Sequence, residues 1–137
     1  MPSKGKLKGT ASAQMCSHAV WKHDIEDHDF PAAQDYLELI MPDPDAKAYA
    51  KRLRELRHQV THKKAKDIFR AARLDLLPTT NVHVATDIDK IHNDIKLSPL
   101  LLIRGNYQKP LIIADGYHRL CAAYHTDEDM DVPCVLL

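Results

Sequence analysis

Hydrophobic residues in the first half of the chain recur at the spacing of one helix face, with polar residues between them. The pattern predicts helices over residues 32–41, 43–59 and 62–73. Pro31 suits the first turn of the first helix, and Asp43 suits the cap of the second. Residues 1–14 carry few apolar side chains, so we expect them to form a loose tail.

The pattern changes after residue 74, where apolar residues gather in shorter and more continuous runs. Thr86 is expected to cap a further helix. The runs 100–103 and 111–114 predict two buried strands, joined at the Gly105-Asn106 turn into a hairpin. The residues that the helix after Thr86 would bury are Ile88, Ile91 and Ile95.

The end of the chain adds a helix over residues 117–125, an acidic turn at 127–129 and a last strand over 132–136. Together these elements predict an α+β fold, in which a small mixed β-sheet with flanking helices follows an N-terminal helical segment. We expect a single domain over residues 15–137, mainly helical over 15–73 and with its α+β core over 74–137.

The composition is that of a folded globular protein. The 137 residues are 45% hydrophobic and 28% charged, with 19 basic and 19 acidic side chains, which excludes disorder of the whole chain. No apolar run is long enough to cross a bilayer, and the first residues contain no apolar segment like that of a signal peptide. Three cysteines without paired spacing indicate reduced thiols. We therefore expect a cytoplasmic protein without a membrane partner.

The balanced net charge hides a strong segregation along the chain. Residues 24–45 contain eight acids and no Lys or Arg, whereas residues 47–73 contain ten bases and only two acids. Such a basic block is typical of a surface that contacts phosphates, so DNA binding is one hypothesis. Alternatively, the bases keep helix faces soluble and pair with nearby acids. The residues that would contact DNA are Lys51, Arg54, Lys63, Lys64, Lys66 and Arg70.

The residues best suited to binding or catalysis lie in the segment Asp-Gly-Tyr-His-Arg at residues 115–119, where a predicted strand meets a predicted helix. The N–H groups at a helix N-terminus favour anions, and glycine allows an oxygen to approach the backbone. Arg119 can donate a bidentate pair of hydrogen bonds, and His118 adds a donor whose charge depends on pH. The same strand, turn and helix also occur in proteins without a ligand, so a structural role is the alternative.

Residues 115–124, with Ser98-Pro99 ahead of the first strand and Val132-Pro133 in the last one, resemble the core of the ParB/sulfiredoxin-like superfamily. The resemblance covers about residues 74–137 and includes the order of the elements. Tyr117 stands where sulfiredoxins carry their catalytic cysteine. Reduction of a sulfinic acid is therefore disfavoured, because a phenol cannot replace a thiolate at neutral pH.

The resemblance implies a nucleotide or another phosphate as the ligand, as in ParB partition proteins, which bind CTP, and in free-serine kinases of this fold. Gly116, Tyr117, His118 and Arg119 would bind a ligand such as ATP, ADP or CTP. Asp115 would meet Mg²⁺ and, with His118, form the catalytic pair for nucleotide hydrolysis or phosphoryl transfer. Candidates for a further carboxylate base are Asp87 and Asp89.

The superfamily also includes domains described as ParB-like nucleases. A nuclease or DNA-binding module that uses the basic residues of 47–73 is therefore the alternative function. Two other groups are weak candidates for metal ligands, because the first has five-residue steps that do not share a helix face and the second straddles a predicted helix end. The first group is Cys16, His18, His23 and His28, and the second is His58 and His62.

Overall fold

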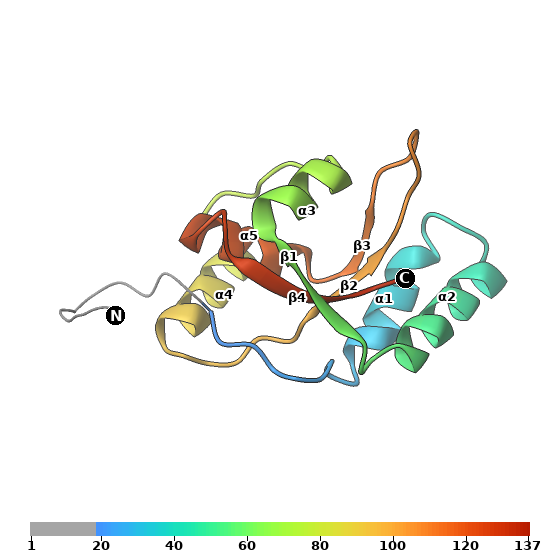
Figure 1. Cartoon of the computed structure of the whole chain (residues 1–137), viewed down its shortest axis with the longest axis horizontal. Helices are drawn as coiled ribbons and strands as arrows, with labels where there is room; N and C mark the ends of the chain where they lie inside the picture. The colour runs from blue at the N-terminus through green and yellow to red at the C-terminus, as the bar shows by residue number, and fades with distance from the viewer. Residues whose placement is uncertain (1–18) are drawn as a thin grey trace.

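A computed structural model describes residues 19–137 (Figure 1). This part of the chain contains five helices and four strands, which confirms the predicted α+β class with a small mixed sheet and flanking helices. The tail expected at residues 1–14, Cys16 and His18 lie outside the described residues. In chain order the elements are α1 (Asp29–Leu37), α2 (Asp43–Glu55), β1 (Val60–Lys64), α3 (Ala65–Ala72), α4 (Val82–His92), β2 (Leu100–Ile103), β3 (Ile112–Asp115), α5 (Tyr117–Thr126) and β4 (Asp131–Leu136).

The strands form one sheet in the order β1-β4-β2-β3. β2 and β3 pair antiparallel as the predicted hairpin, with an irregularity between Leu101 and Leu102. The final strand β4 lies parallel to β2, so that Leu100 faces Cys134. On its other edge β4 pairs antiparallel with β1. The first half of the chain thus supplies one strand of the sheet.

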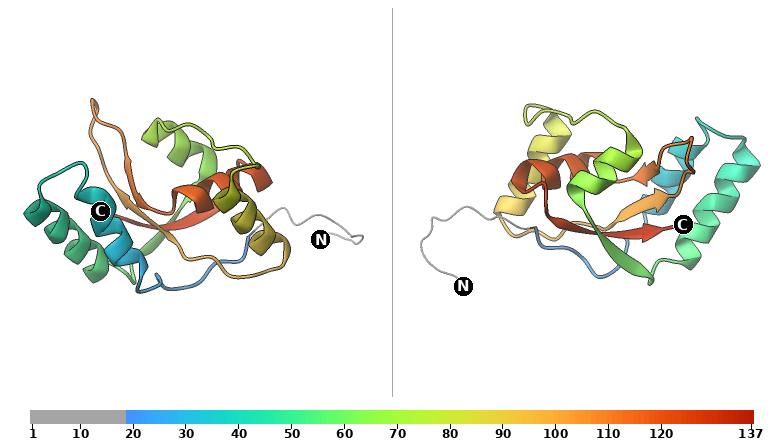
Figure 2. Two further views of the ribbon diagram at one scale, coloured as in Figure 1. Left: turned by 180° about the vertical axis from the view of Figure 1, so that it is seen from behind. Right: turned by 45° about the horizontal axis from the view of Figure 1, so that its top comes forward.

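Helices cover both faces of this sheet, with α1 and α2 on one side and α3, α4 and α5 on the other (Figures 1 and 2). Side chains of β2 alternate between the two cores: Leu101 and Ile103 pack toward α1 and α2, and Leu100 and Leu102 pack toward the other helices. A strand that is buried on both faces needs apolar residues at every position. This explains the continuous apolar run at residues 100–103.

The sequence prediction of a helix over residues 62–73 is wrong at its start. Residues 60–64 form the edge strand β1, and α3 begins only at Ala65. Lys63 and Lys64 therefore belong to a strand, where their exposed positions suit a sheet edge. Residues 60–64 form a strand because they pair with β4, which lies about 70 residues later in the chain. Local periodicity carries no information about that partner.

The boundaries of three helices also differ from the prediction. The helix expected at 32–41 is α1, which begins at Asp29 and ends at Leu37. The helix expected to reach residue 59 is α2, which ends at Glu55. Asn81, not Thr86, caps α4, because its side chain accepts hydrogen bonds from the backbone N–H groups of residues 83 and 84. α4 ends at residue 92, so that Ile95, expected to be buried on it, lies beyond the helix and is half exposed.

Among residues 19–137, no helix combines the length and the apolar character that a membrane span requires.

Candidate functional site

The segment 115–119 forms the junction between β3 and α5, as the sequence predicts. Gly116 lies between the two elements with a φ of 109°, which side chains of L-residues rarely adopt. A Cβ at this position would lie 2.7 Å from Cγ of Leu100 and 3.1 Å from Nη2 of Arg119. Glycine is therefore required by both the backbone and the close packing. No side chain caps α5, so its first N–H groups remain available to a ligand.

Arg119 connects three parts of the fold behind this junction. Its Nη2 donates to Oδ2 of Asp115 at 3.0 Å, to Oδ2 of Asp29 at 3.3 Å and to the carbonyl oxygen of Pro99 at 3.3 Å. Asp29 is only 2% exposed and also accepts from the Ser98 hydroxyl at 2.7 Å. The Nε atom of Arg119 is buried without a hydrogen-bond partner among residues 19–137. An unsatisfied buried donor is rare in native proteins, and stored strain, a catalytic role or a bound water or ion is its usual explanation.

A pocket of about 260 Å³ opens in front of the junction, between α4 and α5. Lys90 and Arg119 supply positive charge to it, and Asp87 and Asp115 supply carboxylates. The imidazole rings of His83 and His118 lie 4.9 Å apart between their centroids. Its full lining is His83, Thr86, Asp87, Lys90, Asp115, Gly116, Tyr117, His118 and Arg119. This is a polar pocket in which proton donors and acceptors of several kinds meet.

Burial shifts the pKa values of the acid and base groups in this pocket. The pKa of Asp115 rises from 3.8 to about 6, chiefly through burial and also through the nearby Asp29, although Arg119 opposes the shift. Burial likewise raises the pKa of Asp87. The pKa of His118 falls below 6.5, because burial and the neighbouring His83 disfavour its charged form. The pocket thus holds an imidazole whose neutral form is favoured beside a carboxyl group that titrates near pH 6, which suits proton transfer.

The raised pKa of Asp115 predicts a measurable dependence of stability on pH. The Asp115 carboxyl binds a proton more tightly in the folded state than in the unfolded state. The proton therefore stabilises the fold at low pH, and this contribution to the free energy of unfolding is lost as pH rises from about 4 to about 6. The Asp115→Asn variant has no carboxyl group at this position, so it should not show this loss. Between these pH values its free energy of unfolding should rise by up to about 3 kcal/mol relative to that of the native chain. Urea unfolding at several pH values measures the difference.

Asp35→Asn, on the exposed side of α1, is the control and should leave the pH dependence of the native chain unchanged. Equal pH dependence of the native chain and Asp115→Asn would contradict the assignment of the raised pKa to Asp115.

Every residue that the sequence assigns to the phosphate site lies at one pocket. Asp115, Gly116, Tyr117, His118 and Arg119 all line it, and so does Asp87, one of the two candidates for a further carboxylate base. The other candidate, Asp89, is exposed and is not part of the pocket lining.

Apart from Asp87, sequence reasoning missed the contribution of α4 to this pocket. His83, Asp87 and Lys90 follow one another at steps of four and three residues, which places them on one face of the helix. That polar stripe beside the buried Val84 and Ile91 is a signal that could have identified them. Asp29 and Ser98 were missed for a different reason: each lies far along the chain from the residue with which it interacts.

The structure does not bring the proposed DNA-binding residues together on one surface. Lys51 and Arg54 belong to α2, and Lys66 and Arg70 belong to α3, on the opposite side of the sheet (Figure 2). Several bases of this set form ion pairs with nearby acids, in line with the alternative of internal pairing. These pairs are Lys64 with Asp131, Lys66 with Asp129, and Arg70 with Asp67.

Of the metal-ligand groups considered in the sequence, Cys16 and His18 of the first lie outside the described residues, and the second, His58 and His62, is only a pair. The one group of three ligand atoms found within 4.8 Å in residues 19–137 is that of Glu26, His28 and Asp29. Asp29 is already bonded to Ser98 and Arg119, so this group serves to anchor the start of α1.

Two cysteines belong to the described part of the chain, and both are core residues. Cys121 and Cys134 are free and buried, and burial raises both of their pKa values, that of Cys134 to about 11. The thiolate form is therefore disfavoured at both positions. The interpretation of Cys121 as a residue of the core is confirmed.

Comparison of the chain with protein-family models, with curated proteins and with solved structures found no match. The resemblance to ParB/sulfiredoxin-like proteins therefore stays a prediction that depends on the motif residues themselves.

Proposed function

We propose that the pocket at the start of α5 binds the phosphate group of a small molecule, such as a nucleotide. One observation carries the proposal: four nitrogen-bearing side chains converge on the uncapped N-terminus of a helix that begins at a glycine. Backbone N–H groups and the helix dipole at such an end attract phosphate oxygens. The four side chains are those of His83, Lys90, His118 and Arg119.

The size of the pocket suits only part of a nucleotide. A volume of about 260 Å³ is below the range of pockets that enclose a whole drug-sized molecule. The phosphate and part of a sugar would fit inside, and a base would lie at the rim. Tyr117 lines this pocket, and its hydroxyl donates to the carbonyl oxygen of Asp75, which fixes the ring in place. A ligand base could stack against such a fixed ring.

The acid and base groups of the pocket support chemistry on a bound phosphate. His118, neutral at physiological pH, would accept a proton from an attacking hydroxyl or water. Asp115, with its pKa raised to about 6, would exchange a proton at slightly acidic pH and would lose it more readily when positive charge approaches. This arrangement favours hydrolysis or phosphoryl transfer over a purely structural role for the segment.

The two carboxylates of the pocket are compatible with Mg²⁺. Magnesium is commonly held by one or two carboxylates together with phosphate oxygens of the ligand, and when bound it neutralises charge on the phosphate. Asp87 and Asp115 are the residues that would hold it, and both have raised pKa values that a nearby cation would lower. Binding of the metal should therefore depend on the phosphate ligand.

Calorimetric titration with ATP, ADP, CTP and inorganic phosphate, each with and without Mg²⁺, tests the proposal. We expect a dissociation constant in the micromolar range for at least one of them. Lys90→Ala and His118→Ala should each weaken that binding about tenfold, because each removes a donor to the phosphate. Lys96→Ala, which removes the same charge just beyond α4, should leave the affinity unchanged.

Absence of binding to all four ligands would refute the proposal. Equal weakening by Lys90→Ala and Lys96→Ala would also refute it, because the effect would then reflect overall charge. The alternative of a duplex-binding module has weaker support, since α2 and α3 carry its residues on opposite sides of the sheet.

A further inference from the structure

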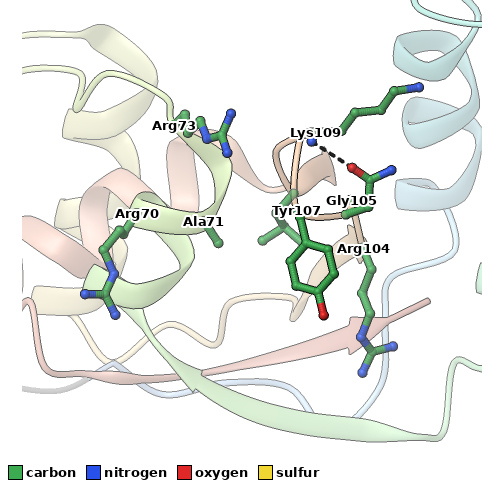
Figure 3. A pocket seen from close by; sticks show the side chains of 9 residues that line it. Arg70, Ala71, Arg73, Arg104, Gly105, Tyr107 and Lys109 are labelled. Atoms are coloured by element: carbon green, nitrogen blue, oxygen red, sulfur yellow. Dashed lines mark hydrogen bonds between the residues drawn. The ribbon is translucent and has the colours of Figure 1, made fainter.

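A second pocket, of about 530 Å³, lies between the end of α3 and the loop that joins β2 to β3 (Figure 3). Arg70 and Arg73 line it from α3 and its C-terminal end, and Arg104 and Lys109 line it from the loop. It shares no lining residue with the pocket at the start of α5. Any role of this second pocket is therefore independent of the proposed phosphate site.

The second pocket is strongly basic. Four cationic side chains line it, and no carboxylate does. Among residues 19–137, Arg70 forms an ion pair with Asp67, at 3.2 Å, whereas Arg73, Arg104 and Lys109 form none. Cations that line one pocket, three of them without a counter-charge among residues 19–137, are suited to a polyanion, because each placed near a phosphate adds a favourable, salt-dependent contribution.

An aromatic ring stands beside these charges. Tyr107, at the tip of the loop, is fully exposed, with a relative exposure of 103%. A large exposed aromatic side chain on a polar loop is unusual and often marks a binding surface. Because the ring has an apolar face and no packing partner of its own, it is free to stack on a ligand.

The loop that presents Tyr107 has a defined shape. Oδ1 of Asn106 accepts from the backbone N–H groups of Gln108 and Lys109, each at 2.9 Å, so that one side chain closes the turn. At Gly105 a Cβ would lie 2.2 Å from the carbonyl oxygen of Lys109, so only glycine fits. A constrained loop loses little conformational entropy when its exposed ring meets a ligand.

A smaller apolar pocket of about 230 Å³ adjoins the basic one. Ala71, Arg104 and Leu111 line both pockets, and Ile68, Leu102 and Leu136 add apolar surface to the smaller. The surface thus places cationic side chains, an exposed aromatic ring and an apolar recess next to one another. A peptide made of acidic residues alone would use only the first of these features, whereas a strand with unpaired bases would use all three.

We infer that this surface, made of Arg70, Arg73, Arg104, Tyr107 and Lys109, binds single-stranded nucleic acid. The cations contact consecutive phosphates, Tyr107 stacks on one base, and a neighbouring base enters the apolar recess. Such contacts read the backbone and the face of a base, so binding should depend little on sequence. A duplex keeps its bases stacked on each other, and therefore offers the ring no partner.

Fluorescence anisotropy with a labelled oligothymidylate of about twelve nucleotides, at low salt, tests the inference. Tyr107→Ala should weaken binding about tenfold by removing the stacking contact, without changing the salt dependence. Arg73→Ala and Arg104→Ala should each weaken binding and lower the slope of log affinity against log salt by about 0.7. Lys51→Ala, on α2 at the other side of the sheet, is the control and should have no effect.

Unlabelled competitors distinguish the inference from its rivals. An unlabelled single strand should displace the probe at far lower concentration than a duplex of the same length or a poly-glutamate peptide. Poly-glutamate that competes as well as the single strand would overturn the inference in favour of an acidic peptide. Failure of the oligothymidylate to bind, or a Tyr107→Ala variant that binds as tightly as the native chain, would overturn it as well. The altered side chains are on the surface, so all variants should retain the native unfolding midpoint in urea.

Discussion

Replacing Arg119 by alanine is expected to lower the free energy of unfolding by about 3–5 kcal/mol near pH 7.5. The guanidinium lies between Asp29 and Asp115, and it also donates to the carbonyl oxygen of Pro99. Without it the buried carboxylate of Asp29 and the partly buried carboxylate of Asp115 face each other with no positive partner, which costs far more than the loss of one surface ion pair. The loss should be smaller near pH 5, because Asp115 can then take up a proton.

Urea unfolding followed by circular dichroism measures this effect. The matched control is Arg70→Ala, which removes another arginine that is paired with an aspartate. Arg70 lies on the surface, so its loss should cost less than about 1 kcal/mol. Similar losses for the two arginine variants would show that Arg119 does not neutralise a buried cluster.

Replacing Gly116 by alanine should be the next most damaging change, with a loss of about 2–4 kcal/mol. Alanine would be held at a φ of 109°, and its Cβ would lie 2.7 Å from Leu100, a fully buried residue of β2. Relief of the contact requires a shift of β2 or of the start of α5. Either shift also moves Arg119, so phosphate affinity should fall together with stability.

Comparison with Gly116→Asn separates the two causes of this loss. Asparagine tolerates positive φ better than alanine but has the same Cβ. If backbone strain dominates, Gly116→Asn is the less destabilised variant, and if the contact with Leu100 dominates, the two are equally unstable. The same urea titration provides both values. A loss below about 0.5 kcal/mol for alanine would contradict the tight packing around Gly116.

The fold was predictable where local sequence determines structure. The apolar run at 100–103 identified β2, and Gly105-Asn106 identified the turn of the hairpin. β1 was missed because its residues, Val-Thr-His-Lys-Lys, are mostly polar and exposed. An edge strand of this kind is stabilised by backbone pairing with β4, which no nearby residue indicates. The cap of α4 was misplaced because Thr86 and Asn81 both suit that role, and only Asn81 bonds the free N–H groups.

The candidate site was predictable to a similar degree. The segment 115–119 carries its own signal, since glycine between a strand and a helix suits anion binding. The groups that set its electrostatics come from elsewhere, with Asp29 at the start of α1 and Lys90 on α4. Contacts across such distances depend on how the layers pack, and a single sequence contains no direct record of that packing.

The cluster around Arg119 and the pairing of β1 with β4 together limit how the chain can be shortened. A fragment that begins at residue 74 would lack Asp29, β1 and both helices of one layer. Its sheet would expose Leu101, Ile103, Ala114 and Val135 to water, and β4 would have an open edge. An apolar sheet face beside an unpaired strand is prone to aggregation. For expression trials and for domain fusions, residues 19–137 therefore have to be kept together.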